Sequence, residues 1–501
     1  MENILEIKQL DKVFGKLHAL EDININIEKG TFNALVGENG AGKSTLAKCI
    51  MGQYTPTSGE IIYKNTPLKT HSNRDSLSKG IGMIYQHFML VEKLTVMENL
   101  LMGQSKIPFL ISWKKEKEKL QAFMDKMPFH LNLNQKVSEL SAGEKQKLEI
   151  LKMLYLDCEL LILDEPTSVL TPDEGEEVLS ILKSMVKEKG LTIIIITHKF
   201  REIFGFADYV HVLRKGKHVG QAPVKDLDKE SLATMMIGEK VIKEKLNVVN
   251  FPNPKLKLKI NQVTTDSDLS APLKDLNIEL YQGAIYGIAG VSGNGQKTLV
   301  DLFAGLEEPT EGSIEINGEP LAVTRKKLHA QKIRCIPEEP LKNACVPNMS
   351  VEDNMVLHVF DLEPYAKYGF IQQKKITEYA DQRTKEYKVK MPSLQSPISN
   401  LSGGNVQRAV LAREISASPE VVIFSNPCFG LDFNATNEIR SRILELRNNG
   451  CAILLLSEDL DEIIELSDKI GVIYHGTIVY ETTNDKDIDI KLIGKKMAGH
   501  E

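Results

Sequence analysis

The chain contains one internal duplication, and this feature limits its possible folds more than any other. Four short blocks of the first half recur in the same order in the second half: GENGAGKST at 37–45 with GVSGNGQKT at 290–298, PTSGEI at 56–61 with PTEGSI at 309–314, LSAGE at 140–144 with LSGGN at 401–405, and LDEP at 163–166 with FSNP at 424–427. A repeat of this length corresponds to a whole domain rather than to a solenoid unit. We therefore predict two related domains at 1–240 and 257–501, joined by a polar, proline-containing linker at 241–256.

Composition is that of a globular protein and argues against several classes of function. Hydrophobic residues make up 42% of the chain and charged residues 26%, which is ordinary for a folded domain. The net charge of −6 argues against a basic surface for nucleic acid. The six cysteines form no C-x-x-C pair, so we expect free thiols in a reducing compartment. No signal peptide is visible, and no apolar run approaches the ~20 residues that a membrane-spanning helix needs. Work at a membrane would therefore require a partner.

Apolar runs place the repeated blocks on regular elements. The runs at 31–36, 160–163 and 193–196 are continuous and strand-sized, which is typical of parallel strands buried on both faces. Residues 44–50 follow the first run with helical spacing, and 104–134 favours helices without strands. The predicted fold class is α/β, with a helical subdomain inserted in the α/β core of each domain.

A glycine-rich segment joins the first strand to the helix that follows. Its glycines allow backbone N–H groups to turn inward around phosphate oxygens, and the helix N-terminus favours negative charge. Lys43 is placed to reach the β- and γ-phosphates of a nucleotide, and the Ser44 hydroxyl to bind Mg²⁺. An ordinary glycine turn is the alternative, but Gly-Lys-Ser at this spacing favours phosphate binding. The predicted nucleotide-binding residues of this segment are Gly37, Glu38, Asn39, Gly40, Ala41, Gly42, Lys43, Ser44 and Thr45.

Two acidic residues and a histidine follow buried strands. Asp164 and Glu165 come directly after the run at 160–163, and His198 follows the run at 193–196. We predict that Asp164 holds Mg²⁺, that Glu165 is the general base for the attacking water, and that His198 contacts the γ-phosphate. The alternatives are solvent-facing acidic residues and a structural histidine. The order of these residues along the chain favours the catalytic interpretation.

Three further positions complete the predicted first-half site. The Gln86 amide is placed to reach Mg²⁺ or the attacking water. The Phe14 ring could stack on adenine, although a core aromatic is nearly as good an explanation for it. The block at 140–144 precedes a helix, so its serine and backbone amides could bind a phosphate.

These motifs, in this order, resemble those of the ABC ATPase superfamily, and the resemblance covers essentially the whole chain. Its most specific element is the signature LSGGN at 401–405, followed by Gln407 and Arg408. The fused halves resemble the tandem ATPases of bacterial sugar-type importers. The segments YQHFML at 85–90, EILKMLY at 149–155 and SEDLDEI at 457–463 resemble the subgroup that works with nucleoside receptors.

The resemblance implies a fold, a cofactor pair and partners. It implies two P-loop ATPase domains arranged head to tail, with ATP and Mg²⁺ bound between the P-loop of one domain and the signature of the other. It further implies two transmembrane permease subunits and a substrate-binding lipoprotein or periplasmic receptor. The chain would then be a peripheral protein at the cytoplasmic face of the cell membrane that powers import of nucleosides.

The second half departs from the family pattern at the positions that carry the chemistry. Without the phosphate-binding lysine, the metal-binding acid, the base and the histidine, no route to fast hydrolysis remains there, although the glycine loop leaves weak nucleotide binding open. The replacements are Gln296 for Lys43, Lys297 for Ser44, Glu338 for Gln86, Ser425 for Asp164, Asn426 for Glu165 and Glu458 for His198.

The signatures show the opposite bias. The second half keeps LSGGN, whereas the first half has Ala142 in place of the first glycine and an acidic Glu144 after Gly143. In a head-to-tail pair, all intact parts would fall into one composite site and all altered parts into the other. We predict a single hydrolytic site, completed by the second-half residues Ser402, Gly403 and Gly404.

Three alternatives remain open at this point. The transported molecule could be a sugar. A tandem ATPase that acts on ribosomes would instead be expected to have two intact sites, a long charged linker and basic patches. A regulatory module without hydrolysis would not need the complete set of first-half residues.

Overall fold

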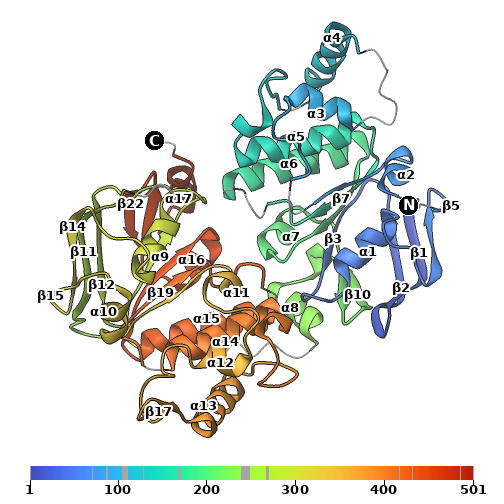
Figure 1. Cartoon of the computed structure of the whole chain (residues 1–501). Helices are drawn as coiled ribbons and strands as arrows, with labels where there is room; N and C mark the ends of the chain where they lie inside the picture. Colours follow the sequence, from blue (N-terminus) through green and yellow to red (C-terminus); the bar gives the residue numbers. More distant parts are fainter. Residues whose placement is uncertain are drawn as a thin grey trace. The chain divides into compact units, whose positions relative to one another are not determined.

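The computed structural model describes residues 2–69, 72–85, 88–103, 111–127, 129–167, 170, 172–238, 249–266, 270–416, 418–431, 433–485 and 487–499. The chain divides into two compact units, Met1–Lys243 and Glu244–Glu501 (Figure 1). Residues 241–248 of the predicted linker lie outside the described residues. Each unit is an α/β domain and is described by itself.

The centre of the first unit is a six-stranded sheet in the order β10-β9-β3-β8-β7-β6. The strands from β9 to β6 pair in parallel, and only the edge strand β10 runs antiparallel to β9. Every residue of β3 and β8 is buried, which explains why their sequences FNALV and TIIII do not alternate. The strands are β3 (Phe32–Val36), β6 (Ile81–Ile84), β7 (Leu160–Asp164), β8 (Thr192–Ile196), β9 (Tyr209–Arg214) and β10 (Lys217–Pro223).

A second, antiparallel sheet in the first unit has the order β2-β1-β4-β5. Its apolar side chains form one core cluster with those of α1 and of strands β3, β7 and β8. The long strands β1 and β2 contain several register shifts, which bend the sheet. The elements are β1 (Asn3–Phe14), β2 (Leu17–Glu28), β4 (Ser58–Tyr63), β5 (Thr66–Pro67) and α1 (Lys43–Ile50).

The remaining helices of the first unit include a group inserted between β6 and β7. In this group α3 and α5 contact each other. Both helices begin with a capping box, in which a serine or threonine and a glutamate satisfy each other's backbone N–H groups. The helices are α2 (Asn73–Ser78), α3 (Val96–Met102), α4 (Trp113–Met124), α5 (Ala142–Tyr155), α6 (Pro172–Lys189), α7 (Phe200–Phe206) and α8 (Lys229–Ile237).

The second unit repeats this architecture. Its large sheet, β16-β19-β20-β13-β21-β22, has the strand order of the first unit, and its antiparallel sheet is β12-β11-β14-β15. The strands are β11 (Leu256–Thr264), β12 (Leu276–Tyr281), β13 (Ile285–Ala289), β14 (Glu311–Ile316), β15 (Glu319–Pro320), β16 (Ile333–Ile336), β19 (Val421–Ser425), β20 (Ala452–Ser457), β21 (Lys469–Tyr474) and β22 (Thr477–Thr483).

The helices of the second unit follow the same plan. A hairpin, β17 (Ala366–Lys367) and β18 (Phe370–Ile371), lies in the stretch where the second half is longer than the first. The helices are α9 (Gln296–Ala304), α10 (Arg325–Ala330), α11 (Pro340–Asn343), α12 (Val351–Met355), α13 (Gln373–Glu386), α14 (Gly403–Ile415), α15 (Phe433–Asn448), α16 (Leu460–Leu466) and α17 (Ile490–Met497).

The elements predicted from the apolar runs agree with these strands and helices. The strands predicted at 160–163 and 193–196 are β7 and β8, and the helix predicted at 44–50 is α1. Of the helical stretch predicted at 104–134, the described part holds α4, whose first residue, Trp113, is 46% exposed. All six cysteines are free. Within the described residues, no helix has both the length and the apolar character to cross a membrane.

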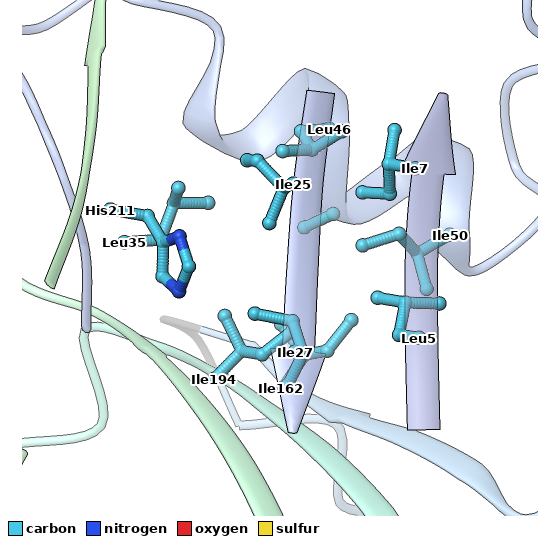
Figure 2. A pocket seen from close by; sticks show the side chains of 11 residues that line it. Leu5, Ile7, Ile25, Ile27, Leu35, Leu46, Ile50, Ile162, Ile194 and His211 are labelled. Carbon is cyan, nitrogen blue, oxygen red and sulfur yellow. The ribbon is translucent and has the colours of Figure 1, made fainter. Parts of the chain in front are cut away.

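A buried histidine interrupts the apolar core between the two sheets of the first unit. Figure 2 shows His211 of β9 among aliphatic side chains that surround a small cavity of about 10 Å³. The ring is 2% exposed, and its Nε2 lies 3.3 Å from Asn33 Oδ1, to which it donates because a carbonyl oxygen can only accept. The other ring nitrogen, Nδ1, is buried without a hydrogen-bond partner in the structure. Burial, with a smaller contribution from His218, lowers the pKa of His211 to about 3.

Acidification should therefore destabilise the first unit through His211. The unfolded chain takes up a proton at this residue below a pH of about 6.5, whereas the folded chain does so only near pH 3. We expect the free energy of unfolding to fall by about 1.6 kcal/mol more between pH 6.5 and pH 5 in the unmodified chain than in His211→Gln. Urea unfolding at both pH values measures this difference, and equal losses in the two proteins would contradict the assignment.

Candidate functional site

The glycine-rich loop lies between β3 and the N-terminus of α1. Gly37, Gly40 and Gly42 have positive φ angles of 151°, 79° and 105°. A Cβ atom at Gly42 would lie 2.7 Å from Leu20 Cδ2 and 2.8 Å from the carbonyl oxygen of Ala19, so a side chain does not fit there. Backbone N–H groups of such a loop, together with the helix N-terminus, form a concave site for phosphate oxygens.

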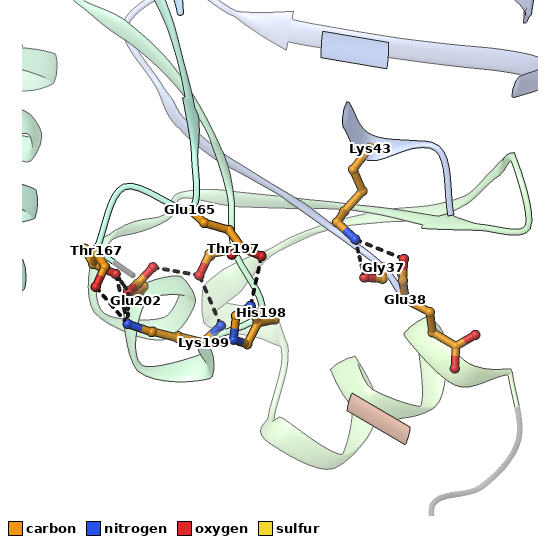
Figure 3. Close-up of polar contacts among 9 residues, drawn as sticks. All are labelled: Gly37, Glu38, Lys43, Glu165, Thr167, Thr197, His198, Lys199 and Glu202. Atoms are coloured by element: carbon orange, nitrogen blue, oxygen red, sulfur yellow. Dashed lines mark hydrogen bonds and ion pairs between the residues drawn. The ribbon is translucent and has the colours of Figure 1, made fainter. Parts of the chain in front are cut away.

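The Lys43 side chain folds back over this loop. Its Nζ donates to the carbonyl oxygens of Gly37 at 2.7 Å and Glu38 at 2.9 Å (Figure 3). The ammonium group is therefore held at the loop by neutral acceptors. A phosphate oxygen would be a stronger acceptor at this position, because it carries a negative charge.

Asp164, the last residue of β7, lies beside the first turn of α1. Burial and the neighbouring Glu165 raise the pKa of Asp164, while Lys43, Lys48 and a hydrogen bond with Ser44 act in the opposite direction. Ser44 and Asp164 thus present a hydroxyl and a carboxylate to the same point. Hard oxygen donors of this kind suit Mg²⁺ together with phosphate oxygens and water. In the described part of the chain, no group of three or more His, Cys, Asp or Glu residues forms a complete protein cage for a metal.

Glu165 and His198 meet at the carboxyl ends of β7 and β8. His198 Nδ1 lies 3.2 Å from Glu165 Oε1, and because an ionised carboxylate only accepts, the imidazole nitrogen donates (Figure 3). Glu165 has a left-handed φ of 50°, and its backbone N–H donates to Ile196 O at 2.9 Å. Burial would raise the pKa of Glu165, but the bond with His198 and the charges of Lys43 and Lys199 outweigh it, so the pKa is lowered. The carboxylate is therefore ionised and oriented at neutral pH.

The other predicted first-half residues are placed less completely. Phe14 ends β1 and is 40% exposed, so it is not a core aromatic. Its ring packs edge-on against Tyr54 with centroids 5.1 Å apart, and Lys12 Nζ lies 4.8 Å from its centroid. Gln86 lies outside the described residues, while the neighbouring Tyr85 hydroxyl accepts from Asn73 Nδ2 at 3.0 Å.

In the loop of the second unit, Gly293 and Gly295 have positive φ angles of 89° and 106°, like Gly40 and Gly42, but the side chain that follows is different. Gln296 Nε2 donates to Val291 O at 3.0 Å, and its Oε1 accepts from the backbone N–H of Asn294 at 3.1 Å. A neutral amide therefore stands where the first unit has an ammonium group. Both ends of this amide are engaged with the loop itself.

The residues that replace Glu165, Gln86 and His198 form a hydrogen-bonded group in the second unit. Asn426 Nδ2 donates to Glu338 Oε2 at 3.0 Å, and Asn426 Oδ1 accepts from the backbone N–H of Glu458 at 2.9 Å. Burial and the nearby Glu338 raise the pKa of Glu458 to about 7, against a lowering contribution from Ser292. A cavity of about 1320 Å³ opens at this group, and Gln296 and Lys297 also line it.

The two signature helices differ at their N-termini. In the first unit, Glu144 accepts from the backbone N–H of Ser141 at 2.9 Å, and Ser141 Oγ accepts from the N–H of Glu144 at 3.2 Å. A carboxylate of the protein thus occupies the start of α5. In the second unit the corresponding residue is neutral: Asn405 Nδ2 donates to Ser402 Oγ at 2.8 Å, and a Cβ at Gly403 would meet nothing within 4 Å. The start of α14 is therefore better suited to an external anion.

Sequence reasoning missed a polar network behind the Glu165–His198 pair. Glu202 of α7 accepts hydrogen bonds from Thr167 and Thr197, and Lys199 donates to Thr167 (Figure 3). The only signal in the sequence was an acidic residue one helical turn after His198.

Comparisons with known proteins place the whole chain within one family. The family model described as ABC transporter matches residues 20–168 and 273–428. The chain is 36% identical to the nucleoside import ATP-binding protein NupA of Lactococcus lactis subsp. cremoris over 98% of each chain. It is also 36% identical to the guanosine import ATP-binding protein NupO of Bacillus subtilis, over 100% of this chain and 98% of that protein. The glucose import ATP-binding protein TsgD13 of Haloferax volcanii is 35% identical over 99% of this chain and 96% of its own length.

Proposed function

Because this chain belongs to the ABC transporter family and is an importer ATPase, we propose that it powers the import of nucleosides. The observation that carries the ATP-hydrolysing role is the arrangement of Lys43, Asp164, Glu165 and His198 around one glycine-rich loop. Two full-length relatives at 36% identity are nucleoside and guanosine import proteins, which favours a nucleoside over a sugar.

Each candidate site residue of the first unit has a role in ATP hydrolysis under this proposal. The loop amides and Lys43 bind and neutralise the β- and γ-phosphates of ATP. Glu165 accepts a proton from the attacking water, and His198 holds the carboxylate while its ring faces the γ-phosphate. Ser44, Asp164 and Gln86 would hold Mg²⁺, which supplies charge neutralisation for the phosphates when it is bound.

We further propose that the chain has one hydrolytic site. Support comes from the neutral Gln296 amide, the Asn426–Glu338–Glu458 group and the self-capped start of α5, all of which disfavour a second site. The family resemblance suggests that Ser402, Gly403 and Gly404 complete the first-unit site. This pairing stays a proposal, because it depends on how the two units assemble.

The proposal includes partners and a location. Under this proposal the chain works with two transmembrane permease subunits and a substrate-binding lipoprotein or periplasmic receptor, as its family implies for an importer ATPase. The chain would act as a peripheral protein at the cytoplasmic face of the cell membrane.

Uptake measurements test the substrate. In cells from which the gene for this chain is deleted, we expect uptake of radiolabelled guanosine, adenosine or uridine to fall at least about tenfold, because ATP-driven import is then lost. The intact chain should restore uptake, and Glu165→Gln should not. If deletion removes only glucose or ribose uptake, the chain serves a sugar importer, as the name of the Haloferax relative suggests for that protein.

A further inference from the structure

Glu202 connects two loops that are far apart in the sequence. One carboxylate oxygen accepts from the hydroxyl of Thr167, which follows Glu165 in the loop after β7. The other accepts from the hydroxyl of Thr197 at 2.7 Å, and Thr197 directly precedes His198 (Figure 3). Glu202 is 7% exposed, and Thr167 and Thr197 are equally well buried. The bonds are therefore shielded from water.

Lys199 closes the same network. Its Nζ donates to the carbonyl oxygen of Thr167 at 3.1 Å and lies 3.8 Å from Glu202 Oε1. Its backbone N–H donates to Thr197 Oγ1 at 3.1 Å. The turn that carries His198 is thus bound on both sides, to the loop after Glu165 and to the start of α7. This positive charge also balances the buried carboxylate.

The two loops that Glu202 connects carry the proposed base, Glu165, and His198. His198 Nδ1 and Glu165 Oε1 lie 3.2 Å apart. Glu165 is two residues before Thr167 and His198 directly follows Thr197, and the hydroxyls of both threonines donate to Glu202. Neither loop is a regular element at this point, so the backbone alone does not set the separation of the two side chains. A misplacement of about 1 Å at a catalytic pair costs about 100-fold in rate.

We propose that Glu202 is a positioning residue for ATP hydrolysis, which holds Glu165 and His198 in register by joining their loops. This inference rests on the proposed roles of Glu165 and His198. Glu202 does not touch the nucleotide in this account and acts only through Thr167, Thr197 and Lys199.

The second unit supplies an internal control. Glu462 of α16 occupies the equivalent place, is 1% exposed, and accepts from Ser457 Oγ at 2.7 Å. Its counter-charge is Arg440, 3.9 Å away, instead of a lysine after the strand. Ser457 directly precedes Glu458, which has no role in hydrolysis under the proposal, and Glu462 Oε1 is buried without a hydrogen-bond partner in the structure. A buried carboxylate is therefore present at the equivalent place of the unit that has no catalytic pair to position, where it bonds to the loop after β20.

Steady-state ATPase kinetics of the purified full chain test the inference with Glu202→Gln and Glu462→Gln. We expect Glu202→Gln to lower kcat by about 10- to 100-fold while KM for ATP stays within about twofold, because the phosphate loop is untouched. Both variants should lower Tm by similar amounts, but Glu462→Gln should leave kcat unchanged. The inference is overturned if Glu202→Gln keeps the full kcat, or if both variants lower kcat equally.

Two variants of Thr197, one that keeps the hydroxyl group and one that removes it, test the same inference if Glu202→Gln does not fold. Serine stands at the equivalent position of the second unit as Ser457, so Thr197→Ser preserves the bond to Glu202 with a side chain that this fold accepts. We expect Thr197→Ser to retain kcat and Thr197→Val to lose about tenfold or more. Equal kcat for the two variants would overturn the inference. Failure of the proposed site itself would look different, because Glu165→Gln would then remain active.

Discussion

We expect replacement of Glu165 by glutamine to lower the steady-state ATPase rate of this chain by about a thousandfold and to leave ATP binding nearly unchanged. A general base contributes roughly 10²- to 10⁴-fold to a rate, and glutamine cannot accept a proton from water. The variant keeps the side-chain length and the left-handed backbone, so the loop at the end of β7 is preserved. Release of phosphate under saturating MgATP measures the effect.

The matched control repairs the second unit. The double variant Gln296→Lys with Asn426→Glu restores a lysine and a carboxylate there, but Ser425 and Lys297 still stand where the metal-binding residues would be. We expect its rate to stay within about twofold of the unmodified chain, since phosphoryl transfer needs the metal-binding groups as well as the base. Substantial turnover by Glu165→Gln would show that the second unit hydrolyses ATP and would contradict the proposal of one hydrolytic site.

The parts of the fold that sequence reasoning predicted are those in which local pattern and tertiary role coincide. β7 and β8 are continuous apolar runs because both faces of the sheet are covered. The loop before Lys43 needs positive φ angles, which its glycines adopt readily. The antiparallel sheet of β1, β2, β4 and β5 was not predicted. Its strands contain bulges that break the alternation of apolar and polar residues.

The predicted site was incomplete for a different reason. The bracing role of Glu202 depends on side chains that come together only when two loops and α7 fold against each other. The Gln296 amide bonds to its own loop, and no periodicity in the sequence announces such a contact. Substitutions at matched positions of a duplicated chain revealed which groups were lost. Only the geometry shows what the replacing side chains do instead.

Replacement of Lys43 by alanine should remove most of the MgATP binding of the whole chain. The ammonium group is the positive charge at the mouth of the first-unit loop, and a hydrogen bond to a charged group contributes about 1.5–3 kcal/mol. We therefore expect the affinity for a non-hydrolysable ATP analogue to fall by about 10- to 100-fold. Calorimetric titration in the presence of Mg²⁺ gives both the affinity and the number of sites, which we expect to be one per chain.

The matched control is Lys297→Ala in the second unit, which removes a positive charge from the equivalent loop. It shows whether loss of any lysine near a glycine-rich loop weakens ATP binding. Lys297 lies one residue later than Lys43 in the repeat, at the start of α9, and lines the open cavity beside Asn426 and Glu458. Because Gln296 already bonds both ends of its amide to the second loop, removal of Lys297 should leave the affinity within about twofold. If Lys43→Ala instead keeps one tight site, or if Lys297→Ala loses one, the second loop binds nucleotide. The neutral amide would then be a substitute for the lysine rather than a sign of its loss.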